Sequence, residues 1–309
     1  EKQLLEMLEN LSKEKYKGHD PYDGTNNSFS IRYSDFSILN FAVQQLIKSS
    51  PINLRSILNI NKDFNAKALG LILNSIALLY NKTKDDKLIK ECESIVKILL
   101  TIRADNENLC WGYNFNWYGT NFFLPKKAPS AVVTATVVKG LYAYYLISKK
   151  KSIIRLIESC CKFVIHDLNV TINGDTICFS YTPFVSNQVH NANLLASEIL
   201  LIGFALTGKQ EYKSNAVSSF KFTLEKQNKD GSWDYSITDQ GSRKQIDWHQ
   251  GFILDSLMLY DEILGLSKGA KDRLMSGAKF YKYTQFYDGK IGFWRYPKFW
   301  PIDIHNQSQ

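Results

Sequence analysis

Apolar residues recur along this chain with the period of α-helices, and the helices that they predict are of two kinds. One kind carries a single apolar stripe: DKLIKECESIVKILLTIR has apolar positions at Leu88, Cys92, Ile95 and Leu99, so one of its faces meets water. The other kind is apolar most of the way round and must be enclosed by other elements. The enclosed helices begin near Ser130, His190 and His249.

A loop pattern precedes these enclosed helices and occurs four times. Each copy has a Gly or Asn turn, an aromatic residue, one further residue and a tyrosine. The copies end at Tyr113, Tyr181, Tyr235 and Tyr296. The helix starts at His190, His249 and His305 lie about 60 residues apart, which is the length of one helical hairpin with its loop. The chain therefore contains a repeated hairpin.

Alternating enclosed and half-exposed helices predict two concentric rings. Two further enclosed helices are expected around 35–49 and 65–81, which with the start at His305 makes six. The sequence thus predicts one all-α domain over residues 1–309, an (α/α)6 toroid whose last hairpin lacks about 40 residues. An open α-solenoid is the structural alternative, but its helices would be more uniformly amphipathic.

Loops that lead into the inner helices of such a ring open at one end, so the residues at the helix starts should converge. Four of the five histidines lie in such loops: His19, His190, His249 and His305. An aspartate beside a histidine can orient the ring, which can then remove or deliver a proton. We expect catalytic roles for His190, His249, His305, Asp247, Asp303 and Tyr181. In the alternative interpretation, Asp and Asn cap the helices while the histidines pack against tyrosines.

Aromatic, amide and carboxylate residues around the same loops are candidates for sugar binding. Aromatic faces can stack on a ligand, although several of these rings must also close the hairpin ends. The DPYDG segment adds two carboxylates, although Asp and Pro also favour a simple turn. The expected binding residues are Asp20, Asp23, Trp111, Trp117, Asn191, Asn193, Trp233, Tyr235 and Trp248.

Composition narrows the function further. The net charge of +8 is spread along Lys-rich helix faces, which weakly favours an anionic ligand and predicts no nucleic-acid partner. No uninterrupted apolar run reaches the ~18 residues of a membrane span. Five cysteines without metal-type spacing are typical of reduced thiols, so a cytoplasmic location is expected. The chain has no phosphate-binding glycine loop or dinucleotide fingerprint, so we expect no organic cofactor, and no metal. The oligomeric state is left open.

The segments YKGHDPYDG, LCWGYNFNW, FSYTP, VHNANLLAS, QNKDGSWDYS, IDWHQGF and WPIDIHNQSQ together resemble a family from bacterial and archaeal polysaccharide gene clusters. Its members often carry the misleading label delta-aminolevulinic acid dehydratase. The resemblance runs from Tyr16 to the end and implies an α/α toroid connected with capsule or exopolysaccharide production. QNKDGSW also resembles the Q-x-x-x-G-x-W repeat of terpenoid cyclases. The likeness to terpenoid cyclases and to six-hairpin glycosidases, which also form toroids, is more distant. The acidic D-x-D-D motif of protonation-initiated cyclases is absent.

Three functions are compatible with this pattern. We favour a carbohydrate-active enzyme that acts on a uronate-containing or otherwise anionic glycan by lyase, epimerase or hydrolase chemistry, with His or Tyr as base and acid. Hydrolysis requires two opposed carboxylates ~5–9.5 Å apart, for which Asp20, Asp23, Asp247 and Asp303 are the candidates. The alternatives are a non-catalytic glycan-binding assembly protein and a terpenoid- or polyprenyl-binding toroid, and fold alone does not separate them.

Overall fold

The computed structural model describes residues 2–26, 38–118, 123–238, 241–287, 291–295 and 298–302. The chain divides into two compact units, Glu1–Lys151 and Ser152–Gln309. This division does not decide whether the chain folds as one domain, which stays a prediction. Asp303, His305 and the expected sixth inner helix lie outside the described residues, as does Tyr296.

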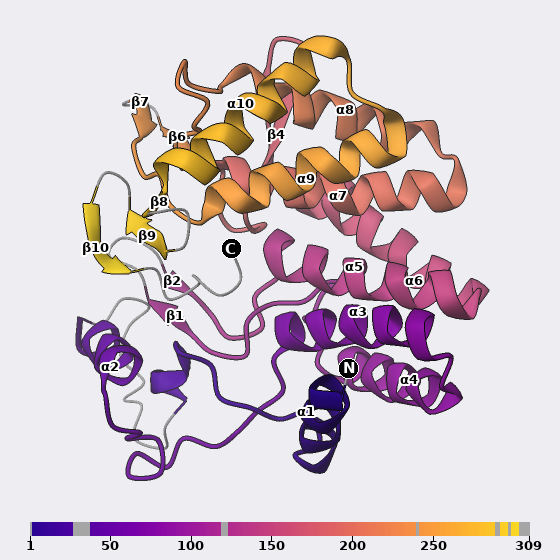
Figure 1. Ribbon diagram of the computed structural model, residues 1–309, viewed down its shortest axis with the longest axis vertical. Coiled ribbons are helices and arrows are strands. Elements are labelled where there is room, and N and C mark those ends of the chain that lie inside the picture. Colours follow the sequence, from indigo (N-terminus) through magenta and orange to yellow (C-terminus); the bar gives the residue numbers. More distant parts are fainter. Residues whose placement is uncertain are drawn as a thin grey trace. The chain divides into compact units, whose positions relative to one another are not determined.

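The first unit is built around a close pair of helices, α3 and α5 (Figure 1). A Cβ atom added to Gly70 of α3 would lie 2.7 Å from the carbonyl oxygen of Thr136, and one added to Gly140 of α5 would lie 2.5 Å from that of Gly70. Only glycine permits such an approach, so the two backbones pack directly. The helices of this unit are α1 (Lys2–Lys13), the 3-10 turn η1 (Asp23–Thr25), α2 (Ile38–Ser49), α3 (Ala66–Thr83), α4 (Asp86–Thr101) and α5 (Ala131–Ser148).

The predicted amphipathic stripe of α4 is confirmed. Leu88, Cys92, Ile95 and Leu99 are at most 3% exposed, and α4 packs against α3. The short strands β1 (Trp117–Tyr118) and β2 (Phe123–Leu124) pair antiparallel in the connection that follows.

Helix α5 begins directly after Ser130, as the sequence predicts, and the Ser130 hydroxyl caps the helix by accepting a hydrogen bond from Val133 N. Among the described residues, α5 is also the one helix that is long and apolar enough to cross a membrane. Because 56% of this span is buried within the protein, the same properties fit a core helix.

The second unit is organised around α7, the most enclosed helix that the structure describes. Fourteen of its 18 residues are buried, and its main partners are α8 and α9. Helix α9 packs against α7 and α10 but leaves Met258 53% exposed, so within this unit it is less enclosed than its sequence predicts. The helices of this unit are α6 (Lys151–Lys162), the π-helical turn η2 (Phe163–Asp167), α7 (His190–Thr207), α8 (Gln210–Glu225), α9 (His249–Leu264) and α10 (Lys268–Thr284).

Several connections that the sequence presents as loops are short antiparallel strand pairs. The Asn173–Thr176 pair flanks a two-residue turn in which Gly174 has a φ of +62°, the left-handed conformation that glycine adopts without strain. The strands are β3 (Val170–Asn173) with β4 (Thr176–Phe179); β5 (Gln188–Val189), β6 (Ser236–Thr238) and β7 (Gly241–Arg243); and β8 (Phe286–Tyr287), β9 (Ile291–Arg295) and β10 (Lys298–Ile302).

The aromatic residue of the repeated loop pattern has the same structural role in three copies. These residues are Trp111, Phe179 and Trp233. Each backbone N–H donates to a side chain in the first turn of the next inner helix: Thr134 Oγ1 (3.0 Å), Asn193 Oδ1 (2.8 Å) and Gln250 Oε1 (2.9 Å), respectively. The pattern therefore ties each loop to the start of the following inner helix.

Candidate active site

An aspartate orients the histidine that begins α9. The Nδ1 atom of His249 lies 2.6 Å from Oδ1 of Asp247, and the same oxygen accepts a hydrogen bond from His249 N at 3.1 Å. The Asp247 side chain is 2% exposed, whereas that of His249 is 15% exposed. A buried carboxylate thus holds an imidazole that still reaches solvent.

Gln245 fixes the other oxygen of this carboxylate. Its Nε2 atom donates to Oδ2 of Asp247 at 2.7 Å. Burial by itself raises the pKa of Asp247, but the hydrogen bonds from His249 and Gln245 outweigh it and leave the pKa below its usual range. Because an ionised carboxylate only accepts hydrogen bonds, Nδ1 of His249 carries the proton that faces Asp247, and Nε2 is the ring nitrogen turned away from the carboxylate.

Two aromatic rings border the same imidazole. The Trp248 ring stacks on His249 with centroids 3.8 Å apart and planes 23° apart, and the Tyr235 ring meets it edge-on at 4.8 Å. Trp248 and Tyr235 are both half-buried. The predicted set of His249, Asp247, Tyr235 and Trp248 is therefore assembled in one place, and we call it the His249 site.

His190 and His249 lie at the same end of the second unit. Val189 of β5 pairs with Ser236 of β6, and the His190 N–H donates to the carbonyl oxygen of Tyr235 at 3.2 Å. The ring of Tyr235 in turn contacts His249. The convergence expected from the repeat thus holds for these two helix starts.

The His190 side chain, however, is almost completely enclosed. It is 1% exposed, its Nδ1 lies 3.4 Å from Thr223 Oγ1, and its ring packs beside Phe222. Burial lowers the pKa of His190 to about 4, so the ring is neutral at neutral pH. This environment favours a structural role, and its catalytic role stays a prediction.

Asn193 has no hydrogen-bonding capacity left for a ligand. Its Oδ1 accepts from Phe179 N and from Ser219 Oγ, and its Nδ2 donates to the Ser219 carbonyl and to Thr223 Oγ1. The neighbouring Asn191 is 3% exposed, and its Oδ1 has no hydrogen-bond partner among the described residues. Tyr181 is 7% exposed, and its backbone N–H donates to Asn187 Oδ1.

Two of the predicted stacking residues lie inside the core. Trp111 and Trp233 are 1% and 0% exposed, and their indole N–H groups donate to carbonyl oxygens of the preceding helices, those of Leu99 and Thr223. Both rings therefore close hairpin ends, and ligand contact by either of them stays an untested prediction.

Asp23 is held inside the first unit. Arg55 Nε lies 2.9 Å and 3.1 Å from its two carboxylate oxygens, and His19 Nδ1 lies 3.1 Å from Oδ2. The side chain of Asp23 is 3% exposed and that of His19 is 27% exposed. The DPYDG segment is thus a turn stabilised by an ion pair that also orients a histidine.

Asp20 faces Asn65 and Lys67. Its Oδ2 accepts from Asn65 Nδ2 at 2.8 Å, and its Oδ1 accepts from Tyr22 N at 2.9 Å. Burial raises the pKa of Asp20, with a smaller contribution from the charge of Asp23, and burial lowers the pKa of Lys67. Trp117 lies in the same unit, half-buried among Tyr22 and Tyr113.

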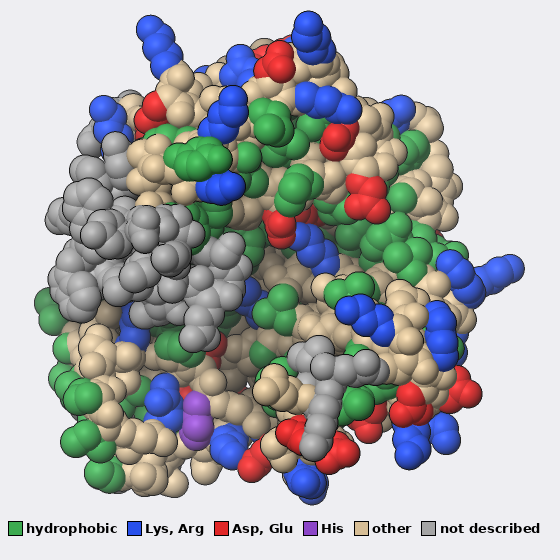
Figure 2. All heavy atoms as spheres, viewed as in Figure 1, with side chains coloured by type: hydrophobic (Ala, Val, Ile, Leu, Met, Phe, Trp, Pro, Cys, Tyr) green, Lys and Arg blue, Asp and Glu red, His purple; other side chains and the backbone are tan. Residues whose placement is uncertain are grey.

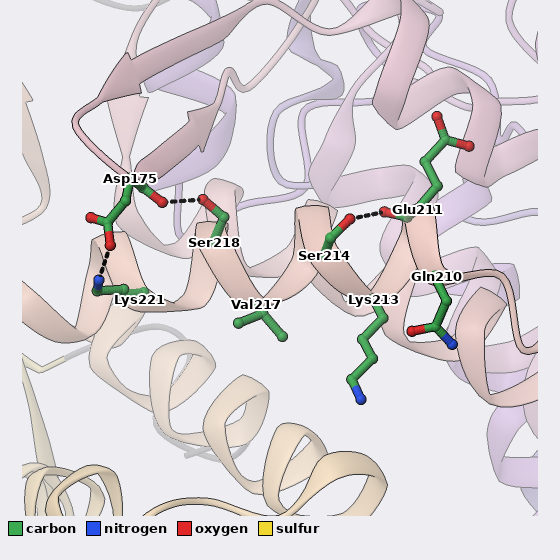
Figure 3. A pocket seen from close by; sticks show the side chains of 8 residues that line it. All are labelled: Asp175, Gln210, Glu211, Lys213, Ser214, Val217, Ser218 and Lys221. Carbon is green, nitrogen blue, oxygen red and sulfur yellow. Dashed lines mark hydrogen bonds and ion pairs between the residues drawn. The ribbon is translucent and has the colours of Figure 1, made fainter.

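A shallow surface hollow on the outer helix α8 contains none of the predicted site residues (Figure 3). Its Lys221 forms an ion pair with Asp175, and Ser218 Oγ donates to the Asp175 carbonyl. These groups satisfy one another, so the hollow gives no indication of a ligand. Within the described part of the chain, no group of three or more His, Cys, Asp or Glu side chains is placed to hold a metal ion.

Charged residues are interspersed on the face drawn in Figure 2, where Lys and Arg alternate with Asp and Glu. All five cysteines are buried, and none forms a disulfide. The mixed charges agree with a net charge spread along the chain, and the buried cysteines agree with the expectation of reduced thiols.

The sequence did not predict Gln245, which holds Asp247, or Arg55, which holds Asp23. Gln245 was detectable, because it lies only two positions before Asp247 and its amide can reach that carboxylate within the same short segment. Arg55 carries no such signal, since it lies 32 residues from Asp23 and only folding brings the two together.

No family model and no curated protein matches the chain. Solved structures do. A family 76 glycoside hydrolase (mannosidase) from Bacteroides thetaiotaomicron is 13% identical, with a TM-score of 0.59 over 77% of this chain and 65% of its own. Cellobiose 2-epimerase from Bacillus thermoamylovorans is 10% identical, with a TM-score of 0.58 over 84% and 73%. An inactive α-1,6-mannanase variant of Salegentibacter sp., with two adjacent aspartates changed to asparagine, is 8% identical, with a TM-score of 0.52 over 88% and 78%.

These likenesses establish the fold. The chain has the all-α fold of the (α/α)6 toroid class, as its hairpin repeat predicts, and spans about two thirds of the mannosidase, 65% of its length. At such low identity a shared fold does not carry an activity with it, because function resides in the site.

Proposed function

We propose that this protein is a carbohydrate-active enzyme of the epimerase or isomerase type, in which His249 transfers a proton at a sugar carbon next to a carbonyl group. The observation that carries this proposal is the 2.6 Å contact between Asp247 Oδ1 and His249 Nδ1, which orients a partly exposed imidazole. Support for a sugar substrate comes from the fold, which is shared with a mannosidase and a cellobiose 2-epimerase.

The chemistry follows from the orientation of the ring. In an open-chain sugar, the C–H bond beside the carbonyl is acidic, and Nε2 of His249 removes this proton while the electron pair moves to the carbonyl oxygen and forms an enediolate. Return of a proton to the opposite face of the same carbon gives an epimer. Return to the neighbouring carbon, with a proton passing from one enediolate oxygen to the other, gives an isomer. The ionised Asp247 stabilises the imidazolium that exists between the two steps.

Hydrolysis is less well supported. The inactive mannanase variant has two adjacent aspartates changed to asparagine. The one adjacent aspartate pair in this sequence, Asp85–Asp86, lies exposed at the start of α4, where Asp85 Oδ1 accepts a hydrogen bond from Lys87 N. Among the described candidates for a catalytic carboxylate pair, Asp23 is held by Arg55 and Asp247 by His249 and Gln245. Asp23 and Asp247 therefore serve to orient other groups, and Asp20 accepts hydrogen bonds from Asn65 Nδ2 and Tyr22 N.

The proposed substrate is an anionic glycan or a sugar derived from one. The sequence resemblance to a family of polysaccharide gene clusters supports a role in making or modifying a capsule or exopolysaccharide, in the cytoplasm. The net charge of +8 favours a negatively charged ligand over a neutral one.

The test is proton exchange at the sugar carbon. Glucose, mannose, cellobiose and glucuronate are incubated with the protein in deuterated water, and NMR follows deuterium incorporation and product formation. We expect exchange at C2 of at least one sugar and a loss of about 10²–10⁴-fold in rate for His249→Gln, the range of general acid–base catalysis.

The matched control is His166→Gln, because His166 is exposed in the turn η2 after α6. Its exchange rate should equal that of the unmodified protein. Exchange that survives in His249→Gln contradicts the proposed role. Absence of exchange with every sugar removes the proposal and leaves the non-catalytic glycan-binding or polyprenyl-binding alternatives.

A further inference from the structure

Four aromatic rings form a cluster in the first unit. The buried Phe115 stacks on Tyr113 and on Tyr22, with centroids 5.2 Å and 6.0 Å apart. Trp117 contacts Tyr113 edge-on at 5.5 Å and Tyr22 at 6.2 Å. Tyr22, Tyr113 and Trp117 are half-buried, so they surround Phe115 while part of each side chain remains accessible. We call these four residues the aromatic cluster.

A single glutamine fixes the two loops that supply this cluster. Gln44 of α2 is 0% exposed, and its Nε2 donates at 2.9 Å both to the carbonyl oxygen of Tyr22 and to that of Asn116. The Oε1 atom of the same side chain accepts a hydrogen bond from Tyr118 N at 3.3 Å. Because one buried amide bonds to both loops, the rings are held in place before any ligand arrives.

Two further hydrogen bonds join the same loops. Asn26 Nδ2 donates to the Asn114 carbonyl at 2.9 Å, and Thr25 Oγ1 donates to the Asn116 carbonyl at 3.4 Å. The rings are therefore already ordered before a ligand binds, so binding does not have to order them. This makes the cluster suitable for recognising a rigid ligand.

A lysine that has no acidic partner among the described residues lies at the edge of the cluster. Lys48 Nζ donates to the Tyr22 hydroxyl at 2.9 Å and lies 4.6 Å from the Tyr22 ring centroid. Within the described part of the chain, no carboxylate lies within ion-pair distance of this ammonium group. An ammonium group has three donors, so Lys48 retains donors for a negatively charged group.

We propose that the aromatic cluster and Lys48 form a subsite for a pyranose ring that bears a carboxylate. The apolar C–H face of the sugar packs against the accessible aromatic surface, where the ring faces carry negative potential, and the carboxylate pairs with Lys48. This inference rests on the carbohydrate class of the proposed function and names the substrate more closely, as a uronate-containing saccharide.

Isothermal titration calorimetry with two matched disaccharides tests the subsite. Cellobiose and cellobiouronate differ only in oxidation of one C6 to a carboxylate. We expect the acid to bind more tightly than cellobiose. Lys48→Met should weaken cellobiouronate about 10-fold and cellobiose less than about 2-fold, since a hydrogen bond to a charged group contributes about that much. Trp117→Leu should weaken both about 10-fold.

The control is Tyr80→Leu. Tyr80 is also half-buried in the first unit and also has a lysine near its ring, Lys84 at 5.4 Å. It lies on α3 and stacks on no other ring among the described residues. Its variant should bind both disaccharides like the unmodified protein. Failure of both disaccharides to bind overturns the subsite, as does equal weakening of the two by Lys48→Met or a Trp117→Leu effect no larger than that of Tyr80→Leu.

The titration is independent of turnover, so the two proposals fail separately. Binding without proton exchange in the unmodified protein leaves the subsite standing and contradicts the proposed function. Exchange at a sugar carbon without disaccharide binding overturns the subsite alone.

Discussion

At the scale of single residues, the chemistry depends on which nitrogen of His249 is occupied. Asp247 takes Nδ1, and Gln245 holds the second carboxylate oxygen so that the aspartate does not rotate away. The three residues lie within five positions of one another, so the local chain supplies the base and the groups that orient it. No long-range contact is required for this part of the site.

His190 shows the opposite behaviour, since its properties come from burial. Its pKa of about 4 in the folded protein lies below the ordinary value of 6.5, so the unfolded chain binds more protons between these two values. The stabilisation contributed by keeping this ring neutral is fully present above pH 6.5 and is lost as the pH falls toward 4.

We therefore expect the free energy of unfolding to fall by about 2 kcal/mol between pH 7 and pH 5 because of this residue. Urea denaturation at both pH values measures the change. In His190→Gln the part due to this ring should disappear, while His166→Gln should retain it. An equal pH dependence in all three proteins would show that His190 titrates normally.

At the scale of elements, the repeated loop pattern ties each hairpin to the next inner helix. Asn193 bonds to β4 through Phe179 N and to α8 through Ser219 and Thr223, and so joins three elements at the first turn of α7. The side chains that accept these bonds differ among the repeats, being Thr134, Asn193 and Gln250. A helix start that resembles a binding motif in sequence is thus used for packing.

Replacing Asn193 by alanine should lower the free energy of unfolding by about 3 kcal/mol, because the buried Phe179 N–H and the groups on α8 lose their partner. Asn191→Ala is the matched control, since Asn191 is buried two positions away and its Oδ1 has no partner among the described residues. Its cost should be about 1 kcal/mol or less. Urea denaturation of both variants decides, and equal losses would contradict the structural role of Asn193.

At the scale of the whole molecule, we expect the two compact units to fold together as one domain. The boundary between Lys151 and Ser152 falls at the start of α6, where there is no Pro- or Gly-rich linker of the kind that separates independent domains. The hairpin repeat continues across this boundary. Both facts support the prediction of one domain.

A single domain should unfold in one cooperative transition. Differential scanning calorimetry is expected to show one peak, with a calorimetric enthalpy equal to the van't Hoff enthalpy. Tryptophan fluorescence and far-UV circular dichroism should give the same midpoint. Two separable peaks would instead assign the units to two domains.

The sequence predicts the helices well because helix starts depend on local signals. The helix starts expected near Ser130, at His190 and at His249 agree with the structure. Local signals do not separate the two roles expected for Trp111 and Trp233, since an aromatic residue in a loop looks the same whether it faces a ligand or closes a hairpin. Both rings are buried, and their contact with a ligand stays a prediction.

By itself, then, the sequence determined the class of fold, the hairpin repeat and the Asp247–His249 pair, because all of these depend on periodicity or on residues near one another in the chain. Only the tertiary structure decided that His190 is enclosed, that Arg55 holds Asp23 and that Gln44 fixes the aromatic cluster. Burial and long-range contacts arise when distant segments pack together, and no local pattern encodes which segments will meet.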